Sequence, residues 1–209
     1  MNKLIVFLTL VIFQICLTFL SKELLDTDYI VVNSLSEKLS VEQIKEFIDF
    51  REKWQWLGYI VLPLLLLIKI SILSATLDIG CFFFNKEIKY KKLFNIVVKA
   101  EFIFLLVVVF KTIWFYFFQT DYNLEDLQYF YPLSALNIIG YEGLQPWFIY
   151  PFQVLNLFEL AYWVILAYLI GKEINDTKST KGLQIVASSY GVSLLIWVVG
   201  VMFFTLNMS

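Results

Sequence analysis

The sequence contains no histidine among its 209 residues and few charged side chains. Charged residues make up 16% of the chain, against about 25% in a typical soluble domain, while hydrophobic residues make up 60%. The missing histidine removes the commonest general base and metal ligand. The formal net charge of −2 provides no overall positive field for nucleic acid. This composition excludes a soluble globular protein and a disordered one.

Catalytic and metal-binding patterns are missing as well. The chain has no phosphate-binding glycine loop, no nucleophile elbow, and no paired-cysteine or histidine metal spacing. Its two cysteines, Cys16 and Cys81, lie in apolar runs that the topology below places near opposite membrane faces, so we expect no disulfide. The sequence therefore predicts a protein that is not an enzyme, with no cofactor, no bound metal and no nucleic-acid partner.

Five apolar windows are long enough to cross a membrane, since a span needs about 20 mostly apolar residues. They cover approximately residues 4–20, 56–84, 94–118, 147–170 and 183–206. We interpret the first as an uncleaved helix, because bulky residues stand where a signal-peptide cleavage site needs small ones. The predicted fold class is all-α: one transmembrane domain over residues 1–209, an integral membrane bundle of five helices.

Lysines indicate the orientation of this bundle. Two short loops, 85–92 and 171–182, hold seven of them: Lys86, Lys89, Lys91, Lys92, Lys172, Lys178 and Lys181. The longer segments 21–55 and 119–146 hold five cations, all in the first. The positive-inside rule therefore predicts an inner N-terminus and an outer C-terminus. Because the chain is rich in Lys, Ile, Asn and Phe, we expect an AT-rich bacterial source and an inner (cytoplasmic) membrane location.

The two outer segments differ from each other. Ser40 and Gln43 have the spacing of a capping box, and apolar residues recur at helical spacing after them. This pattern predicts either an amphipathic helix lying on the outer interface or one long helix continuing into the second span. Residues 119–146 are aromatic and too short to span, which indicates an interfacial helix or a re-entrant piece packed on protein.

The second and third spans resemble the fourth and fifth in layout. Their inner loops begin with Asn-Lys-Glu-Ile at 85–88 and Gly-Lys-Glu-Ile at 171–174. Lys69 and Glu159 each stand about a dozen positions after a tryptophan at the start of the hairpin. Two readings stay open: a tandem duplication of helical hairpins related by an axis along the membrane normal, or convergence on common loop and entry residues.

Five ionisable residues fall within the predicted spans: Lys69, Asp78, Glu101, Lys111 and Glu159. Each costs a few kcal/mol at the bilayer centre, so each should face a partner or a cavity. Lys69 and Glu159 both fall near the midplane. We predict that they pair directly or through a short polar network, as a structural lock or as a proton or ion relay. Asp78 and Glu101 lie toward the inner side, and Lys111 lies toward the outer side.

The fifth span has one small, weakly polar face. It comprises Ala187, Ser189, Gly191 and Ser193. Small residues four positions apart allow close helix approach, so this face is expected to pack within the bundle or against a partner subunit.

The run from Phe152 to Gly171 resembles the Yip (Ypt-interacting protein) membrane family. The matching positions are Asn156, Phe158, Tyr162 or Trp163, and Gly171. The resemblance implies five spans and an adaptor or scaffold without catalytic residues.

Three functions therefore remain as hypotheses. The first is a non-enzymatic accessory subunit of a larger membrane complex concerned with export or the envelope, with other integral membrane proteins as partners. The second is a small-solute or proton-coupled transporter that uses the intramembrane charges. The third is an immunity protein that binds one dedicated ligand.

Overall fold

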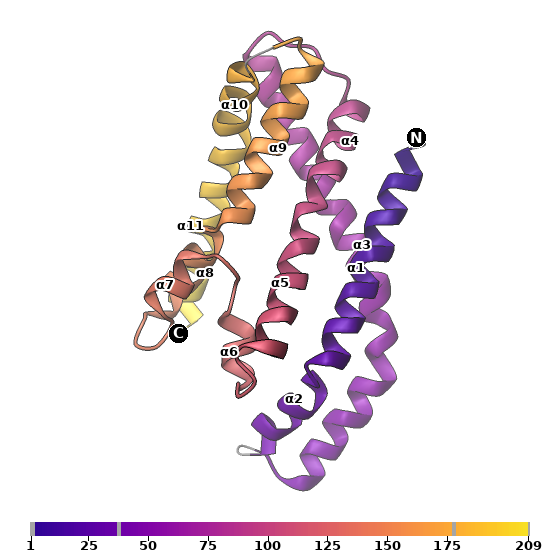
Figure 1. The fold of residues 1–209 in the computed structure, drawn as a ribbon, viewed down its shortest axis with the longest axis vertical. Coiled ribbons are helices and arrows are strands. Elements are labelled where there is room, and N and C mark those ends of the chain that lie inside the picture. The colour runs from indigo at the N-terminus through magenta and orange to yellow at the C-terminus, as the bar shows by residue number, and fades with distance from the viewer. Residues whose placement is uncertain (1–2, 37–38, 177–178, 209) are drawn as a thin grey trace.

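The computed structural model describes residues 3–36, 39–176 and 179–208, and it is helical over most of them (Figure 1). Lys178, one of the loop lysines, lies outside the described residues. The helices are α1 (Lys3–Leu24), α2 (Thr27–Ser36), α3 (Val41–Phe83), α4 (Tyr90–Glu101), α5 (Ile103–Phe117), α6 (Leu124–Tyr129), α7 (Ala135–Ile139), α8 (Pro146–Val154), α9 (Leu157–Glu173), α10 (Thr180–Val186), the π-helical turn η1 (Ala187–Gly191) and α11 (Val192–Met208).

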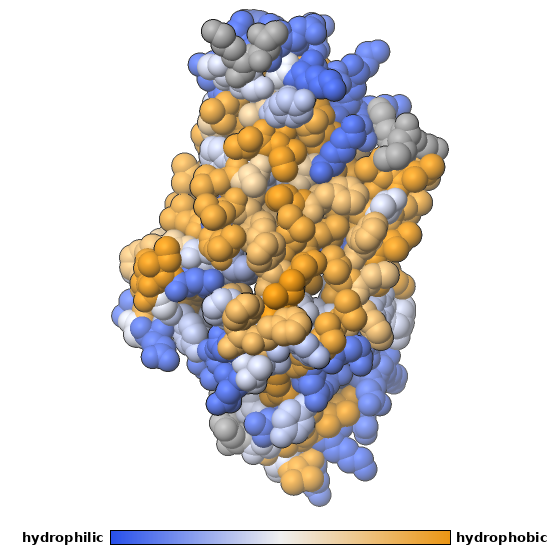
Figure 2. Space-filling model, in the orientation of Figure 1, coloured by the Kyte–Doolittle hydropathy of each residue, from blue (hydrophilic) through white to orange (hydrophobic). Residues whose placement is uncertain are grey.

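Within the described residues, four helical stretches are long and apolar enough to cross a membrane. They are Leu4–Leu24, Val41–Phe83, Tyr90–Phe117 and Thr180–Met208. Figure 2 shows the surface that results, a broad apolar band between two hydrophilic ends. An apolar surface of this extent would be unfavourable in water but is suited to lipid. The all-helical fold and these four helices indicate an integral membrane protein.

Helix α3 is much longer than one membrane crossing. Its 43 residues correspond to about 65 Å at 1.5 Å per residue, against a hydrocarbon core of about 30 Å. The capping box is present: Ser40 Oγ accepts from the Gln43 amide at 3.4 Å, and Gln43 Oε1 accepts from the Ser40 amide at 3.0 Å. Of the two expectations for this region, the single long helix is confirmed. A separate interfacial helix is wrong, because α3 runs as one helix from Val41 to Phe83 and continues through Pro63, which cannot donate a backbone hydrogen bond.

The first part of α3 is held by α2. Asp28 forms ion pairs with Lys22, at 2.9 Å, and with Arg51 of α3. Figure 1 shows α2 beside the end of α3 that lies farthest from the α3–α4 connection. This part of the chain is therefore a helical pair that extends past the apolar band.

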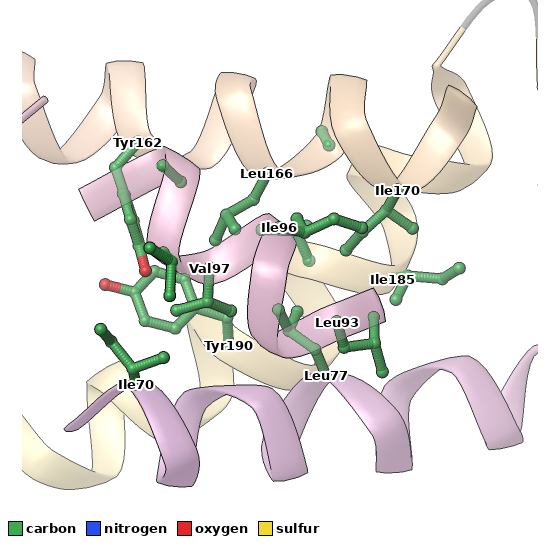
Figure 3. Close-up of a cluster of buried hydrophobic side chains, with 14 of the residues drawn as sticks. Ile70, Leu77, Leu93, Ile96, Val97, Tyr162, Leu166, Ile170, Ile185 and Tyr190 are labelled. Atoms are coloured by element: carbon green, nitrogen blue, oxygen red, sulfur yellow. The ribbon is translucent and has the colours of Figure 1, made fainter. Parts of the chain in front are cut away.

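The core lies where α3, α4, α9 and α10 meet. Helix α4 packs against both α3 and α9, and α10 packs against α9. Figure 3 shows the side chains that fill this contact, among them Leu77, Leu93, Val97, Leu166 and Ile170, each at most 1% exposed. Close approach of α10 to α9 depends on Gly182, since a Cβ there would overlap the carbonyl oxygen of Ala167. Helix α1 packs on the outside of α4 and α5.

The predicted continuous span over residues 147–170 is wrong. The chain forms α8 and α9 there, separated at Leu155 and Asn156. Extended backbone at Asn156 interrupts the helix, and the Asn156 side chain caps α9 by accepting from the Glu159 amide at 2.7 Å. The side chain of asparagine can bond to nearby backbone groups in place of the helical bonds, and so favours helix boundaries. Hydropathy does not measure this effect.

Residues at and just before the start of α7 form hydrogen bonds with the backbone groups that the break leaves without helical partners. Ala135 N donates to Leu155 O at 2.8 Å, and Leu157 N donates to Leu133 O at 3.2 Å. Non-helical backbone at membrane depth is tolerated where it is buried in protein or lines a water-filled cavity. Aromatic side chains within residues 119–146 also pack on the rest of the protein. The ring centroids of Tyr122 and Phe115 are 4.7 Å apart, and the Tyr122 hydroxyl donates to the carbonyl of Leu25.

Candidate functional site

Two carboxylates, the buried Glu101 and the half-buried Glu159, form the polar centre of the bundle. Glu101, at the end of α4, has a side chain only 2% exposed. Its Oε2 accepts from Lys69 Nζ of α3 at 2.9 Å, and its Oε1 accepts from the Tyr162 hydroxyl of α9 at 2.9 Å. The Lys69 ammonium also lies 4.5 Å from the ring centroid of Phe104, within cation–π range. Both oxygens of this carboxylate therefore have partners.

Glu159 is held separately. Its Oε1 accepts from the Tyr190 hydroxyl at 2.6 Å and from Trp163 Nε1 at 3.0 Å. It occupies the first turn of α9, where the partial positive charge of a helix N-terminus stabilises an anion. The side chain does not close a capping box, because the Asn156 amide instead donates to Val154 O at 2.9 Å. The carboxylate is thus positioned by side chains rather than used as a cap.

Lys69 therefore forms its ion pair with Glu101. A direct pair between Lys69 and Glu159, the first of the two predicted arrangements, is wrong. The reason is packing: α3 lies against α4, which carries Glu101, whereas α9 packs mainly against α10, α4 and α5. The tyrosine that donates to Glu101 and the tyrosine that donates to Glu159 are in contact with each other. The rings of Tyr162 and Tyr190 are in edge contact at 5.4 Å, and Figure 3 shows them side by side at one end of the core.

A cavity of about 650 Å³ joins both charges. Lys69 and Glu159 both lie on its wall. The remaining lining includes the aromatic residues Phe104, Tyr131, Tyr150, Tyr190 and Trp197 and the polar residues Gln153, Asn156 and Ser193. Small-molecule sites in proteins have about 300–1,000 Å³ and combine apolar walls with a few convergent polar groups. The cavity has the size and composition of such a site.

The broken helix shapes one wall of this cavity. Gln153, Val154 and Asn156 line it, and all three lie at or beside the break between α8 and α9. Gln153 Nε2 donates to the carbonyl of Tyr129 at 3.0 Å, which ties the break to the end of α6. Tyr131 follows in the same outer segment, and burial, reinforced by the charge of Glu159, raises the pKa of its phenol. This phenol therefore stays neutral at physiological pH.

The remaining predicted residues have various surroundings. Lys111 donates to the carbonyl of Leu127 in α6, so it has a protein partner. Asp78 is exposed on α3 and does not line the cavity. Ser189 and Gly191 pack inside the bundle: a Cβ at Gly80 would meet Ser189, and one at Gly191 would meet Trp163. Ala187 is exposed, and Ser193 lines the cavity. Of the four residues of this face, Ser189 and Gly191 therefore belong to an internal packing surface and the other two do not.

Sequence reasoning missed the aromatic donors, Tyr162, Trp163 and Tyr190, and the capping role of Asn156. One signal was available, because Asn156 followed three positions later by Glu159 is a helix-start pattern. Tyr190 had no comparable signal. It lies in the π-helical turn η1, and such turns displace side chains from their regular helical positions and are frequent at functional sites.

The helix start at Asn156 leads to a stability prediction. Asn156→Ala removes the cap of α9 and two bonds from Asn156 Nδ2, to the carbonyls of Gln153 and Val154. We expect a loss of about 1–2 kcal/mol in the free energy of unfolding, measured in detergent. Asn137→Ala, at an exposed position of α7, is the control and should change stability by less than about 0.5 kcal/mol. Equal effects of the two substitutions would contradict the capping role.

Among the described residues, no group of three or more His, Cys, Asp or Glu side chains is placed to hold a metal ion. Comparison of the chain with protein-family models, with curated proteins and with solved structures gave no match. The function is therefore inferred from the arrangement of the residues in the structure.

Proposed function

We propose that this protein is a non-enzymatic membrane transporter that binds a small solute in the cavity between α3, α8, the start of α9 and α11. The main observation in support is that one cavity of about 650 Å³ has both Lys69 and Glu159 on its wall. Charged groups within membrane segments are costly and usually mark solute or ion pathways. A structural lock alone does not require an open cavity beside it.

The interrupted helix supports the same proposal. Membrane transporters commonly bind substrates where a helix is discontinuous, because the unwound backbone and the helix ends supply polar groups at membrane depth. Here the break at Leu155 and Asn156 borders the cavity, and Glu159 stands in the first turn after it. A change in the bonds between residues 133–135 and 155–157 would alter the cavity wall.

The topology that accompanies this proposal has five crossings, with α8 and α9 together forming the fourth. Figure 1 supports it: the N-terminus lies toward the end that carries the α3–α4 and α9–α10 connections, and the C-terminus toward the other. With the loop lysines inside, the N-terminus is inner, and the cavity wall includes Tyr131 of the segment assigned to the outer side. The proposed location is a bacterial inner membrane. Tandem duplication of the hairpins remains a prediction.

Water access to the cavity is the first test. In a background with Cys16 and Cys81 replaced by alanine, we expect Ser193→Cys to react with a membrane-impermeant, charged thiol reagent in membrane vesicles. Ser74→Cys is the matched control, because Ser74 is 0% exposed in the core of α3. It should stay unreactive under the same conditions. An unreactive Ser193→Cys would show that the cavity is closed to water and would count against a transport path.

Uptake is the second test. Proteoliposomes with purified protein are given radiolabelled choline, succinate, glycine or glucose, which represent a cation, an anion, a zwitterion and a neutral solute. We expect uptake of at least one class above that of protein-free liposomes. Uptake of none of the four would overturn the proposed function.

An accessory-subunit role is the second candidate. It is favoured by the extension of α3 beyond the apolar band, where Phe50 and Trp54 are 64% and 44% exposed. Such a projecting helix is a suitable contact for another protein, as the resemblance to the Yip family would imply. Purification in mild detergent followed by mass spectrometry tests it. A stoichiometric partner lost on Phe50→Ser would support this role, and a protein that purifies alone would contradict it.

A further inference from the structure

The charges around the cavity are unequal. Lys69 contributes one ammonium, while Glu101 and Glu159 contribute two carboxylates, which leaves one formal negative charge at the site. Lys69 is already engaged by Glu101 at 2.9 Å and by the ring of Phe104 at 4.5 Å. A solute anion approaching Lys69 would compete with a carboxylate that is almost completely buried. The surplus charge therefore favours a positively charged solute.

Glu159 is the group that can receive it. Among the described residues, the donors to its side chain are Tyr190 and Trp163, and both bonds end on the same oxygen, Oε1. These two bonds orient the carboxylate on the cavity wall, and they leave its Oε2 as the natural acceptor for a ligand. Asn156 and the first turn of α9 hold the backbone of Glu159 in place.

Aromatic rings surround the same space. Tyr131, Tyr150, Tyr190 and Trp197 all line the cavity with Glu159, and Tyr150 and Trp197 are linked by a bond from Trp197 Nε1 to the Tyr150 hydroxyl at 2.8 Å. Aromatic faces attract organic cations, and several rings with one carboxylate form the usual site for a substituted ammonium group. Rings attract a small inorganic cation less effectively once it keeps its water shell.

We propose that the solute bound in this cavity is an organic cation, an amine or quaternary ammonium compound whose charged group lies against Glu159 and within the rings of Tyr131, Tyr150, Tyr190 and Trp197. This inference rests on the proposed transport function and specifies its substrate class. The apolar remainder of the wall, including Leu65 and Leu194, is suited to hydrocarbon substituents on the cation.

Equilibrium binding to the purified, full-length protein tests the inference. The probes are radiolabelled choline and its uncharged carbon analogue dimethylbutanol, which have the same shape and differ in charge. We expect choline to bind about tenfold or more tightly than the analogue. Glu159→Gln should reduce this preference severalfold, because glutamine still accepts from Tyr190 and Trp163 but carries no charge, which leaves only the rings to attract the cation. Glu173→Gln, at the exposed partner of Lys92, is the control and should keep it.

A second variant protects the test against misfolding. Trp197 is 63% exposed, so Trp197→Leu should leave the fold intact while it weakens choline binding severalfold and leaves dimethylbutanol binding unchanged. Equal affinity of the wild type for choline and dimethylbutanol would overturn the inference. Uptake of succinate, glycine or glucose without choline binding would also overturn it but would leave the transport function standing. Uptake of none of the four solutes would instead overturn the transport function itself.

Discussion

Replacing Lys69 with methionine is expected to lower the free energy of unfolding by about 2–3 kcal/mol, because it removes the ammonium that pairs with the buried carboxylate of Glu101. Methionine keeps much of the apolar stem of lysine, so the cavity wall retains its shape. The Glu101 carboxylate, only 2% exposed, is left with Tyr162 as its remaining donor. An uncompensated charge in this position is more costly than the interaction that was lost. Thermal unfolding in detergent, followed by circular dichroism, measures the effect.

Two further variants separate this explanation from a general loss of packing. Glu101→Gln combined with Lys69→Met removes both charges while an oxygen still accepts from Tyr162, so most of the stability should return. Lys92→Met breaks the pair with Glu173, whose carboxylate is 34% exposed and so remains hydrated, and should cost about 0–1 kcal/mol. If Lys69→Met were no more harmful than Lys92→Met, the pair with Glu101 would not be important to the bundle.

Gly182→Ala should destabilise the protein by about 1–3 kcal/mol although alanine is the better helix former. The added Cβ would overlap the carbonyl oxygen of Ala167 and would lie 3.0 Å from the amide nitrogen of Gly171. Both are backbone atoms of α9, so no flexible side chain can move aside. Helices α9 and α10 would have to separate, and the contacts of Leu166, Ile170 and Ile185 in the core would loosen. The same unfolding measurement applies.

Gly200→Ala is the matched control for this prediction. Gly200 is also helical, in α11, but a Cβ there would meet nothing within 4 Å. The change in stability then depends on helix propensity alone, and the substitution should stabilise the protein by about 0.5–1 kcal/mol. The two glycines should therefore respond with opposite signs. A stabilising Gly182→Ala would show that α9 and α10 are not closely packed at this point.

The sequence was most informative where one physical property dominates. Apolar windows identified the membrane helices around α1, α3, α4–α5 and α10–α11, since hydropathy summed over about 20 residues outweighs local detail. The capping box at Ser40 and Gln43 identified the start of α3 correctly. The window at 147–170 failed because a single polar residue, Asn156, interrupts a helix within apolar surroundings.

The site was predicted only in part. The rarity of membrane-depth charges directed attention to Lys69, Glu101 and Glu159, and all three lie at the polar centre of the bundle. Their partners could not be predicted, because depth along a helix axis does not determine which side of that helix faces which neighbour. Tyr190 illustrates this, since its position depends on the π-helical turn as well as on its place in the sequence.

Composition and spacing by themselves determined that the chain is helical and apolar over membrane-length stretches and which of its charges are costly there, because these are properties of each residue and its near neighbours. Tertiary structure alone decided that Lys69 pairs with Glu101, that α8 and α9 separate at Asn156, and that a cavity opens beside Glu159. Those outcomes depend on how α3, α4, α9 and α11 pack, and packing depends on contacts between residues far apart in the chain.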